Sequence, residues 1–328
     1  MKAVRWALLG TSGTADAVFA PVLSGLAGTE LVGAVGSTPA GSAGFKERHA
    51  AERSFANLDD LVEDPSVDAV WIATPNDLHA SQAIQLLEAG KHVLVEKPMA
   101  ISTLDAQKVV QAARRSGCVL RVGYHQRFRR AHQELRDAMS DGLLGTVGLA
   151  RLHAYFAYPQ DPPAWRRSVE RSGGWAINDI GTHLVDLALW ALGPVSLESC
   201  WLGTTRFGVA TDDTTVLVLS LEGGGRVVID TSTALASPGS RIEVYGSAGY
   251  FRAEGSFDGP TAVETSWGGK SELPAEDALA AEVTDFNQVV RGNASASLGE
   301  DGVLATENVR LIEQARAFPF SLVLVGSA

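Results

Sequence analysis

The feature that most restricts the fold is a regular alternation of short apolar runs with helical segments over the first 122 residues. Runs rich in Val, Leu, Ile and Ala occupy residues 4–9, 31–35, 69–73, 92–95 and 119–122. Strands that are apolar along their whole length are typical of a parallel sheet covered by helices on both faces. We therefore predict a doubly wound, Rossmann-type α/β sheet, in which ligands bind at the carboxyl ends of the strands.

The pattern changes after a helix that we expect at about residues 131–140. Longer strands with period-two alternation begin at 147–158, and two pairs of strands flank glycine-containing turns at 223–225 and 246–249. Such pairs are typical of antiparallel hairpins. We predict a first domain over residues 1–122 that contains the parallel sheet, and an α+β domain with a large, mostly antiparallel open sheet over residues 123–328. A last helix is expected at 302–317.

Composition excludes several classes of partner. The formal net charge is −11 and no dense Lys/Arg stripe interrupts it, which argues against nucleic acid. No apolar run reaches the length of about 18 residues that crosses a bilayer, and the apolar start around Trp6 fits a buried strand better than a signal peptide. The two cysteines, Cys118 and Cys200, are far apart in the sequence and fit free thiols in a reducing cytoplasm. We expect a cytoplasmic protein that binds neither nucleic acid nor membrane.

A glycine-containing turn follows the first strand and opens a helix. It consists of Gly10, Thr11, Ser12, Gly13, Thr14 and Ala15. In this context the backbone N–H groups can face the pyrophosphate of a dinucleotide. The usual GxGxxG/A spacing would place its second glycine at Ser12, so the match is imperfect, and an ordinary strand-to-helix turn is the alternative.

The end of the second strand bears on the choice of cofactor. An acidic residue at that end accepts the ribose hydroxyls of NAD. Glu30 lies at the usual sequence distance but precedes the strand, so it is about 15 Å from the binding edge at about 3.3 Å per residue. The edge carries Ser37 and Thr38, which do not repel a 2′-phosphate and can donate to it. We predict NADP(H) as the favoured cofactor and NAD(H) as the other choice; a plain loop start is the alternative for Ser37 and Thr38.

Polar side chains also follow the third and fourth strands of the series. Thr74, Pro75, Asn76 and His79 come directly after 69–73, where their polar groups can reach the same edge of the sheet. A helix-capping role explains Asn76 or Asp77 equally well, and a lone His is more often structural. Lys97 stands just beyond the strand 92–95, so an ionisable amine is expected beside a bound nucleotide.

A second ionisable group lies much later in the chain. Asp179 and His183 are four residues apart and Asp186 lies three further, so a helix starting near Asp179 places them along one stripe. A His beside a carboxylate on an otherwise apolar helix suits proton transfer. A buried polar network is one alternative, and a metal site is another, although no third His or Cys lies at ligand spacing. We predict no metal.

Taken together, these motifs make the chain similar to the Gfo/Idh/MocA family of sugar-type oxidoreductases over nearly its whole length. The motifs that carry the resemblance are Ala73-Thr74-Pro75-Asn76 with His79, residues 89–98 with Glu96, Lys97 and Pro98, residues 123–128 with His125 and Arg127, Trp165-Arg166, Ser172-Gly173-Gly174, and residues 179–186. The Ser-Thr pair after the second strand and Trp165-Arg166 resemble the 1,5-anhydro-D-fructose reductase branch of the family.

The resemblance implies roles for individual residues. Lys97 would contact both nicotinamide and substrate, and the peptide bond between Lys97 and Pro98 would be cis. Trp165 and Arg166 could reach the cofactor or the substrate from the second domain. The other implied cofactor contacts are Thr74, Pro75, Asn76, His79 and Glu96, and the other implied substrate contacts are His125, Arg127, Asp179 and His183. For Arg127 a solvated helix start is the alternative. Where the family has a further Gly, this chain has Trp175, whose large ring would narrow the pocket.

The resemblance also implies an activity. It is reversible hydride transfer between C4 of NADP(H) or NAD(H) and a carbinol or carbonyl carbon of a sugar, polyol or sugar derivative. Lys97 and His183 would be the acid and base, and Asp179 would polarise or position the substrate oxygen. Two other functions stay open: a regulator that binds NAD(P) without turnover, and an NAD-dependent glycosidase with no net redox change. A homodimer or homotetramer is implied, formed through the open face of the second sheet.

Overall fold

The chain divides into two compact units, each described here by itself. The computed structural model describes residues 2–159, 161–236, 239–255, 257, 259–293, 298–299, 301–318 and 322–324. One unit comprises Met1–His125 with Leu279–Thr306, and the other Gln126–Ala278 with Glu307–Ala328. In the described residues, no helix combines the length and apolar composition that a membrane span requires.

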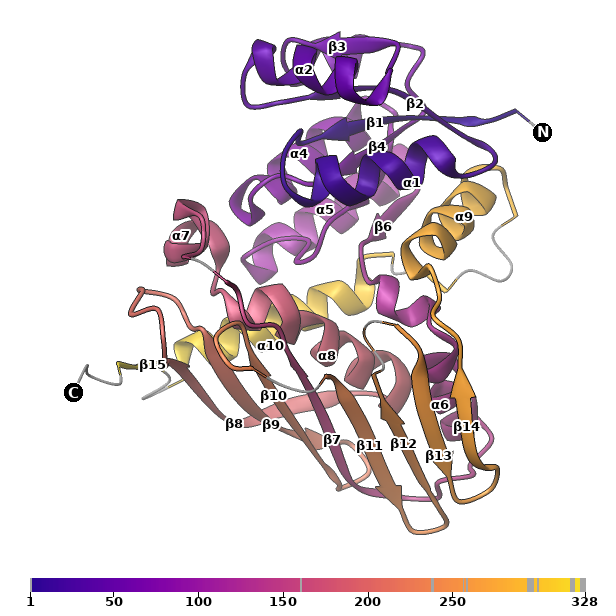
Figure 1. Cartoon of the computed structure of the whole chain (residues 1–328), viewed down its shortest axis with the longest axis vertical. Coiled ribbons are helices and arrows are strands. Elements are labelled where there is room, and N and C mark those ends of the chain that lie inside the picture. The colour runs from indigo at the N-terminus through magenta and orange to yellow at the C-terminus, as the bar shows by residue number, and fades with distance from the viewer. Residues whose placement is uncertain are drawn as a thin grey trace. The chain divides into compact units, whose positions relative to one another are not determined.

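The first unit is built on a parallel sheet, which in the described part of the chain has six strands in the order β3-β2-β1-β4-β5-β6 (Figure 1). The strands are β1 (Val4–Leu9), β2 (Thr29–Val35), β3 (Arg53–Phe55), β4 (Ala69–Ile72), β5 (His92–Val95) and β6 (Leu120–Val122). The helices between them are α1 (Ala20–Gly25), α2 (Pro39–His49), α3 (Leu58–Glu63), α4 (Asn76–Glu88) and α5 (Thr103–Ser116). The predicted doubly wound sheet is confirmed. Only the short strand β3 was not predicted.

The central strands are buried along their whole length, which explains their continuous apolar sequence. All four residues of β4 are buried, and in β1 only Arg5 is partly exposed. Trp6 of β1 and Trp71 of β4 lie in one core cluster, and Phe19 stacks on Trp71 with 4.1 Å between ring centroids. This aromatic core supports the middle of the sheet, whose carboxyl edge carries the predicted site residues.

Helix α9 (Ala278–Val290) belongs to the first unit although it follows the second sheet in sequence. Its Val283 and Phe286 lie in the core of that unit, and the Phe286 ring is 4.7 Å from the Trp6 ring. Trp6 Nε1 also donates to Asn287 Oδ1 at 3.1 Å. The compact units therefore differ from the predicted division into continuous residues 1–122 and 123–328. The reason is that α9 packs on Trp6 and so belongs to the core of the first unit.

The second unit is built on a mostly antiparallel sheet. Counting the residues that the structure describes, it has nine strands in the order β14-β13-β12-β11-β7-β10-β9-β8-β15. The strands are β7 (Val147–Tyr155), β8 (Val195–Thr204), β9 (Thr214–Leu221), β10 (Arg226–Ser232), β11 (Arg241–Gly246), β12 (Tyr250–Glu254), β13 (Thr261–Thr265), β14 (Gly269–Leu273) and β15 (Leu322–Leu324). The pairs β7–β10 and β8–β15 are parallel and the others antiparallel. The large sheet and both predicted hairpins, β9–β10 and β11–β12, are confirmed.

Helices cover one face of this sheet. They are α6 (Arg130–Ser140), α8 (Thr182–Leu187) and α10 (Val303–Ala317), whereas the short helix α7 (Val169–Ser172) stands apart from the face of the sheet (Figure 1). Wider turns extend α8 on both sides, Ile177–Gly181 before it and Ala188–Leu192 after it, and the first of these contacts β7, β9 and β10 (Figure 1). Asn308 of α10 donates to the Thr182 carbonyl at 2.8 Å and accepts from its hydroxyl at 3.0 Å. The helix that carries Asp179 and His183 is thus held against the sheet and against α10.

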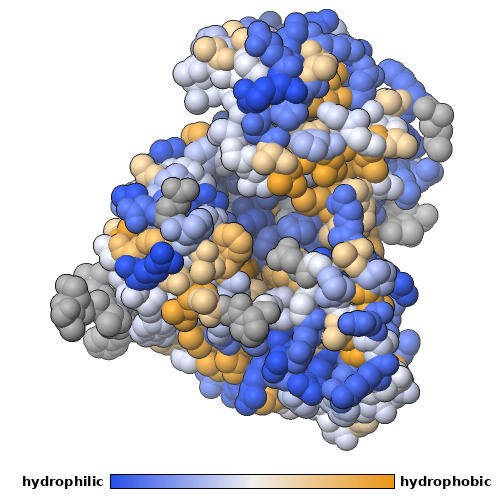
Figure 2. Space-filling view, in the orientation of Figure 1, coloured by the Kyte–Doolittle hydropathy of each residue, from blue (hydrophilic) through white to orange (hydrophobic). Residues whose placement is uncertain are grey.

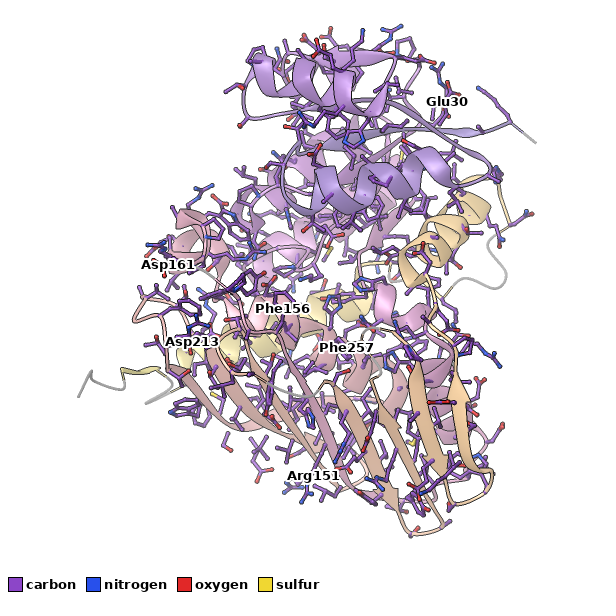
Figure 3. The ribbon with its side chains drawn as sticks, in the orientation of Figure 1. Glu30, Arg151, Phe156, Asp161, Asp213 and Phe257 are labelled. Carbon is purple, nitrogen blue, oxygen red and sulfur yellow. The ribbon has the colours of Figure 1, made fainter. Side chains whose placement is uncertain are left out.

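The other face of the sheet carries a row of alternating charge. Arg151 of β7 is in register with Glu243 of β11, and Arg252 of β12 lies 3.2 Å from both Glu243 and Glu264 of β13. Hydrophilic residues accordingly gather over β11–β13 near the bottom of Figure 2, and Arg151 is labelled in Figure 3. On the neighbouring strand β10, Val228 lies in register with Arg151 on the same face and is partly exposed. This face therefore combines charged and apolar side chains.

Candidate active site

The turn after β1 has the space that a dinucleotide phosphate requires. At Gly10, φ is +124° and a Cβ would lie 2.7 Å from the Ala73 carbonyl oxygen, so only glycine lets the turn pass this close to the end of β4. At Gly13, φ is +56° and a Cβ would meet nothing within 4 Å, so the space beside the turn is open. A helix begins at Ala15. The predicted residues 10–15 thus fit a bound pyrophosphate.

The end of β2 carries Ser37 and Thr38, as the sequence predicts. The Thr38 hydroxyl accepts the Gly41 N–H at 3.1 Å and caps α2, so it is already engaged, whereas Ser37 is exposed. Glu30 is the second residue of β2 and lies 3.4 Å from Arg5, at the end of the strand opposite to Ser37 (Figure 3). Its predicted position at the start of the strand, away from the carboxyl end, is confirmed.

Arg48, in the last turn of α2, is a cation that sequence reasoning missed at this edge. Its Nη2 donates to Asp16 Oδ1 at 2.8 Å and to the Thr11 carbonyl at 3.4 Å. The hydrogen bond from Arg48 is the largest influence on the pKa of the Asp16 carboxyl, which is lowered, and His49 at 2.8 Å acts in the same direction. The fold, rather than local sequence, brings α2 back to the glycine turn.

His79 is buried and joins the ends of β4 and β5. Its Nδ1 lies 2.8 Å from the Pro98 carbonyl oxygen, and its Nε2 lies 2.8 Å from that of Thr74. Burial lowers the pKa of His79, and the charge of Lys97 lowers it further, against the two carbonyl oxygens. The neutral ring donates to one of the two carbonyls at a time. At 1% exposure it supports the edge from beneath, a structural role in place of the predicted cofactor contact.

Lys97 lies two residues beyond β5 and is partly exposed. The Lys97–Pro98 peptide bond is cis, as predicted. Glu96 accepts a hydrogen bond from Trp71 Nε1 at 3.0 Å, which fixes the residue that precedes the lysine. A Cβ on Gly123 would lie 2.9 Å from Glu96 Oε1, so the chain after β6 passes close by. The core beneath the sheet thus positions the segment that presents Lys97.

The remaining predicted residues of the first unit lie beside Lys97 at the ends of β4 and β6. Thr74 donates from its hydroxyl to Gln82 Oε1 at 2.6 Å, Pro75 is the N-cap of α4, and Asn76 is buried in the first turn. The alternative of capping by Asn76 or Asp77 does not hold, because the N-cap is Pro75 and these two residues are the first of the helix itself. His125 is partly exposed and begins a short turn after β6.

In the second unit, two residues hold the Asp179 carboxylate. The Tyr158 hydroxyl donates to Asp179 Oδ2 at 2.7 Å, and Arg166 Nη2 lies 3.3 Å from Oδ1. The Arg166 guanidinium stacks on the Trp165 ring, with 4.5 Å from Cζ to the centroid. The predicted pair Trp165-Arg166 is therefore brought to Asp179. Tyr158 was not predicted, and burial followed by the charge of Asp179 raises its pKa.

Trp175 lies behind Tyr158 rather than in a pocket. Its side chain is 1% exposed, and its ring packs edge-on to Tyr158, at 5.4 Å, and against Phe207, at 5.0 Å. The expected narrowing of the pocket by this ring is wrong, because the ring fills the interior of the second unit. The substitution of a small residue by Trp175 instead gives Tyr158 a rigid apolar support.

Two adjacent aspartates, which sequence reasoning did not single out, fix the segments around Asp179. Asp212 accepts the N–H groups of Trp175 at 2.9 Å and Ile177 at 2.8 Å, at the start of the helix that carries Asp179. Asp213, labelled in Figure 3, accepts the N–H groups of residues 205–207 at 2.7, 2.8 and 3.1 Å. Both side chains are buried. They act as caps, a role that depends on tertiary contact and leaves no local signal.

His183 and Asp186 follow Asp179 along the same helix but differ in surroundings. His183 is 6% exposed, and its ring is edge-on to Phe257 at 6.2 Å. Asp186 accepts two hydrogen bonds from Arg127, at 2.9 Å from Nε and 2.6 Å from Nη2. Burial raises the pKa of Asp186, and Arg127 opposes this. This pair belongs to the interior.

Arg127 was predicted to contact substrate, with a solvated helix start as the alternative. It is 3% exposed, its guanidinium is engaged by Asp186, and it also lies 5.6 Å from the Trp190 ring. These contacts give it a structural role in place of both interpretations. Throughout the described residues, no group of three or more His, Cys, Asp or Glu side chains is placed to hold a metal ion.

Comparisons with known proteins find matches to both parts of the chain. Residues 4–124 match the oxidoreductase family with an NAD-binding Rossmann fold, and residues 132–252 match the GFO/IDH/MocA C-terminal domain. The chain is 30% identical over 315 residues to 1,5-anhydro-D-fructose reductase of Ensifer adhaerens, covering 91% of this chain and 92% of that protein. It is also 30% identical over 336 residues to inositol 2-dehydrogenase of Rhizobium meliloti (strain 1021), covering 95% and 98%.

A solved structure shares the fold. Levoglucosan dehydrogenase in complex with NADH and levoglucosan has a TM-score of 0.83 to this chain at 20% identity, covering 96% of this chain and 97% of that one. Both family matches and the full-length relatives lead to the same assignment. The chain belongs to the Gfo/Idh/MocA family of NAD(P)-binding oxidoreductases.

Proposed function

We propose that this chain transfers a hydride between the nicotinamide of NADP(H), or NAD(H), and a carbinol or carbonyl carbon of a sugar, polyol or sugar derivative. The observation that carries the proposal is the presence, in a member of this family, of Lys97 at the carboxyl end of the parallel sheet and of Asp179 with His183 on one helix of the second unit. The names of the full-length relatives support a sugar or polyol as substrate. Bound NAD(P) would supply the hydride donor or acceptor.

This chain's own residues supply binding, orientation and a proton. Lys97 and His183 are the proposed acid and base, and the Asp179 carboxylate orients the substrate oxygen. His125 completes the proposed substrate set, from which Arg127 is withdrawn because it is buried against Asp186. The proposed cofactor contacts are Gly10, Thr11, Ser12, Gly13, Thr14, Ala15, Ser37, Thr38, Thr74, Pro75, Asn76, Glu96, Lys97, Trp165 and Arg166.

The preference for NADP(H) belongs to the same proposal. It is supported by the absence of a carboxylate at Ser37 and Thr38 in the described end of β2, and by the Arg48 guanidinium beside the glycine turn. A 2′-phosphate needs a donor or a cation there. Asp16, which binds Arg48, moderates that charge, so NAD(H) stays the second choice.

Assembly and compartment are proposed on separate grounds. The sheet face that carries Arg151, Glu243 and Val228 combines charge and apolar surface, which supports a homodimer or homotetramer formed through this face. Cys118 and Cys200 are free thiols, which supports the cytoplasm. Light scattering of the purified protein tests the first of these points.

The function is tested by titrating NADPH and NADH while following Trp fluorescence, and then by assaying the tighter cofactor against a panel of polyols and ketoses. Lys97→Ala should remove turnover. The matched control is Lys108→Ala on α5, because Lys108 is exposed and pairs with Asp105 three residues before it, at 2.8 Å. Full turnover by Lys97→Ala on a substrate of the native chain would contradict the proposal.

A further inference from the structure

We propose that Tyr158 is a positioning residue for the reaction: its hydroxyl fixes the Asp179 carboxylate in the orientation that meets the substrate. This inference rests on the proposed function, since it needs Asp179 to act on a substrate oxygen. It adds to that function a residue outside every motif that identifies the family in this chain. The argument uses only contacts within the second unit.

The backbone at Tyr158 is held from two sides. Just beyond the end of β7, the Tyr158 N–H donates to the Thr233 carbonyl at 2.9 Å. The Tyr158 carbonyl accepts from Arg206 Nη1 at 3.0 Å. The preceding Phe156 N–H donates to the Ser232 carbonyl at 2.8 Å, so the segment continues the pairing of β7 with β10. The residue therefore sits on the rigid sheet rather than on a free loop.

The ring of Tyr158 is held as firmly as its backbone. Trp175 packs edge-on to it at 5.4 Å, and Phe156, labelled in Figure 3, packs edge-on at 5.1 Å. Trp175 is itself held in place, because its backbone N–H donates to the buried Asp212 at 2.9 Å and its side chain is 1% exposed. A phenol ring between two aromatic edges has little freedom to turn, so the hydroxyl stays directed at Asp179.

The two donors divide the carboxylate between them. Tyr158 donates to Oδ2 and Arg166 lies at Oδ1, so the plane of the Asp179 carboxylate is defined by two contacts of different kinds. Arg166 is the longer contact, at 3.3 Å, and its side chain is 21% exposed, so it is the weaker constraint. A carboxylate oxygen can accept more than one hydrogen bond, which leaves capacity for a substrate hydroxyl.

Tyrosine suits this task better than a second cation would. A cation neutralises the charge of the carboxylate that it binds, whereas a neutral hydroxyl orients the carboxylate and leaves its charge in place. Burial raises the pKa of Tyr158, and the charge of Asp179 raises it further, so the hydroxyl keeps its proton over the whole working range of pH. Arg166 also contacts this carboxylate, and His183 lies one helical turn further along the same helix.

The test compares Tyr158→Phe with Tyr155→Phe. Both substitutions remove one hydroxyl from the end of the same strand region, but the Tyr155 hydroxyl donates to Asp230 on the neighbouring strand β10. We expect Tyr158→Phe to lower kcat by about tenfold to hundredfold with KM changed less, because a small misplacement of a reacting group has effects of this size. The acid limb of the pH–rate profile should move to higher pH, because the Asp179 carboxylate loses a donor that favours its ionised form. Tyr155→Phe should match the native chain in all three quantities.

A second readout does not depend on turnover. In protein labelled with ¹³C at the aspartate carboxyl carbons, Asp179→Asn identifies the Asp179 resonance, and its titration is compared in the native chain and both variants. Tyr158→Phe should shift that titration to higher pH, and Tyr155→Phe should leave it in place. An unshifted titration, or an unchanged kcat and pH profile in Tyr158→Phe, overturns the inference. If the titration shifts but the native chain turns over none of the panel, the proposed function fails and the role of Tyr158 in a reaction fails with it.

Discussion

Replacing Arg127 by Met tests whether this arginine serves the fold or the substrate. Met is chosen because it keeps much of the apolar stem and removes the charge. In the native chain the guanidinium makes two hydrogen bonds to Asp186, at 2.9 and 2.6 Å, and the two side chains are 3% and 1% exposed. Arg127→Met leaves Asp186 as a buried carboxylate without its cation.

The size of the effect follows from that burial. Removing one partner of a buried ion pair destabilises a protein by about 3–5 kcal/mol, because the other charge stays desolvated. Burial already raises the pKa of Asp186 while Arg127 lowers it, so the variant raises it further. A carboxyl whose pKa is higher in the folded chain than in the unfolded chain binds more protons when folded, and stability then falls as pH rises. The loss should therefore be larger at about pH 8 than at about pH 5.

The assay is urea unfolding followed by Trp fluorescence at several pH values, with a double variant as the control. Arg127→Met with Asp186→Leu removes both charges, and it should recover most of the stability and lose the added pH dependence. Kinetics on the double variant complete the test. A stable double variant with a KM raised tenfold or more would refute the structural assignment of Arg127, and so would a single variant within about 0.5 kcal/mol of the native chain.

Two further predictions concern a buried histidine and the glycine turn. Burial lowers the pKa of His132 to about 4, so the unfolded chain binds more protons than the folded chain between about pH 4 and 6.5. As pH falls through that window, the unfolding free energy of the native chain should drop by about 3 kcal/mol relative to that of His132→Asn. A difference in unfolding free energy that does not change with pH would contradict this. Gly10→Ala places a Cβ 2.7 Å from the Ala73 oxygen and should weaken NADPH binding measured by fluorescence. The control Gly90→Ala changes a glycine with φ +79° beside open space, so it should lower only the melting temperature. Equal NADPH affinity in the two variants would count against the proposed cofactor turn.

The first sheet was predictable because its strands are buried on both faces. Burial on both sides demands an apolar residue at nearly every position, and that demand is visible without any structure, as β1 and β5 illustrate at their predicted bounds. Strand β3 has three residues, two of them exposed, so no such demand applies to it. The edge strand β14 is exposed at four of its five positions and gives equally little signal.

The site was predictable only where a motif places a residue at the end of an element. Lys97 follows β5, and Asp179 lies in the first turn of the helical segment that continues to His183, so order along the chain located these residues. Tyr158 reaches Asp179, at 2.7 Å, from a segment 21 residues earlier, and Arg48 reaches the Thr11 carbonyl of the glycine turn, at 3.4 Å, from a segment 37 residues later. Contacts of that kind follow from packing, which a single sequence does not reveal.

Two aspartates on one helix, each paired with an arginine from another segment, explain why similar residues have different roles. Arg127 and Asp186 are buried and close, at 2.6 Å, whereas Arg166 and Asp179 are partly exposed and 3.3 Å apart. A desolvated pair has one favourable geometry, so it anchors the helix, and a half-solvated pair can exchange one contact for another. Because Asp186 lies about two turns from Asp179, the anchored pair limits the motion of the carboxylate at the other end of the helix. Tyr158 and Arg166 then set the orientation of that carboxylate, and a fixed orientation is what a group acting on substrate requires.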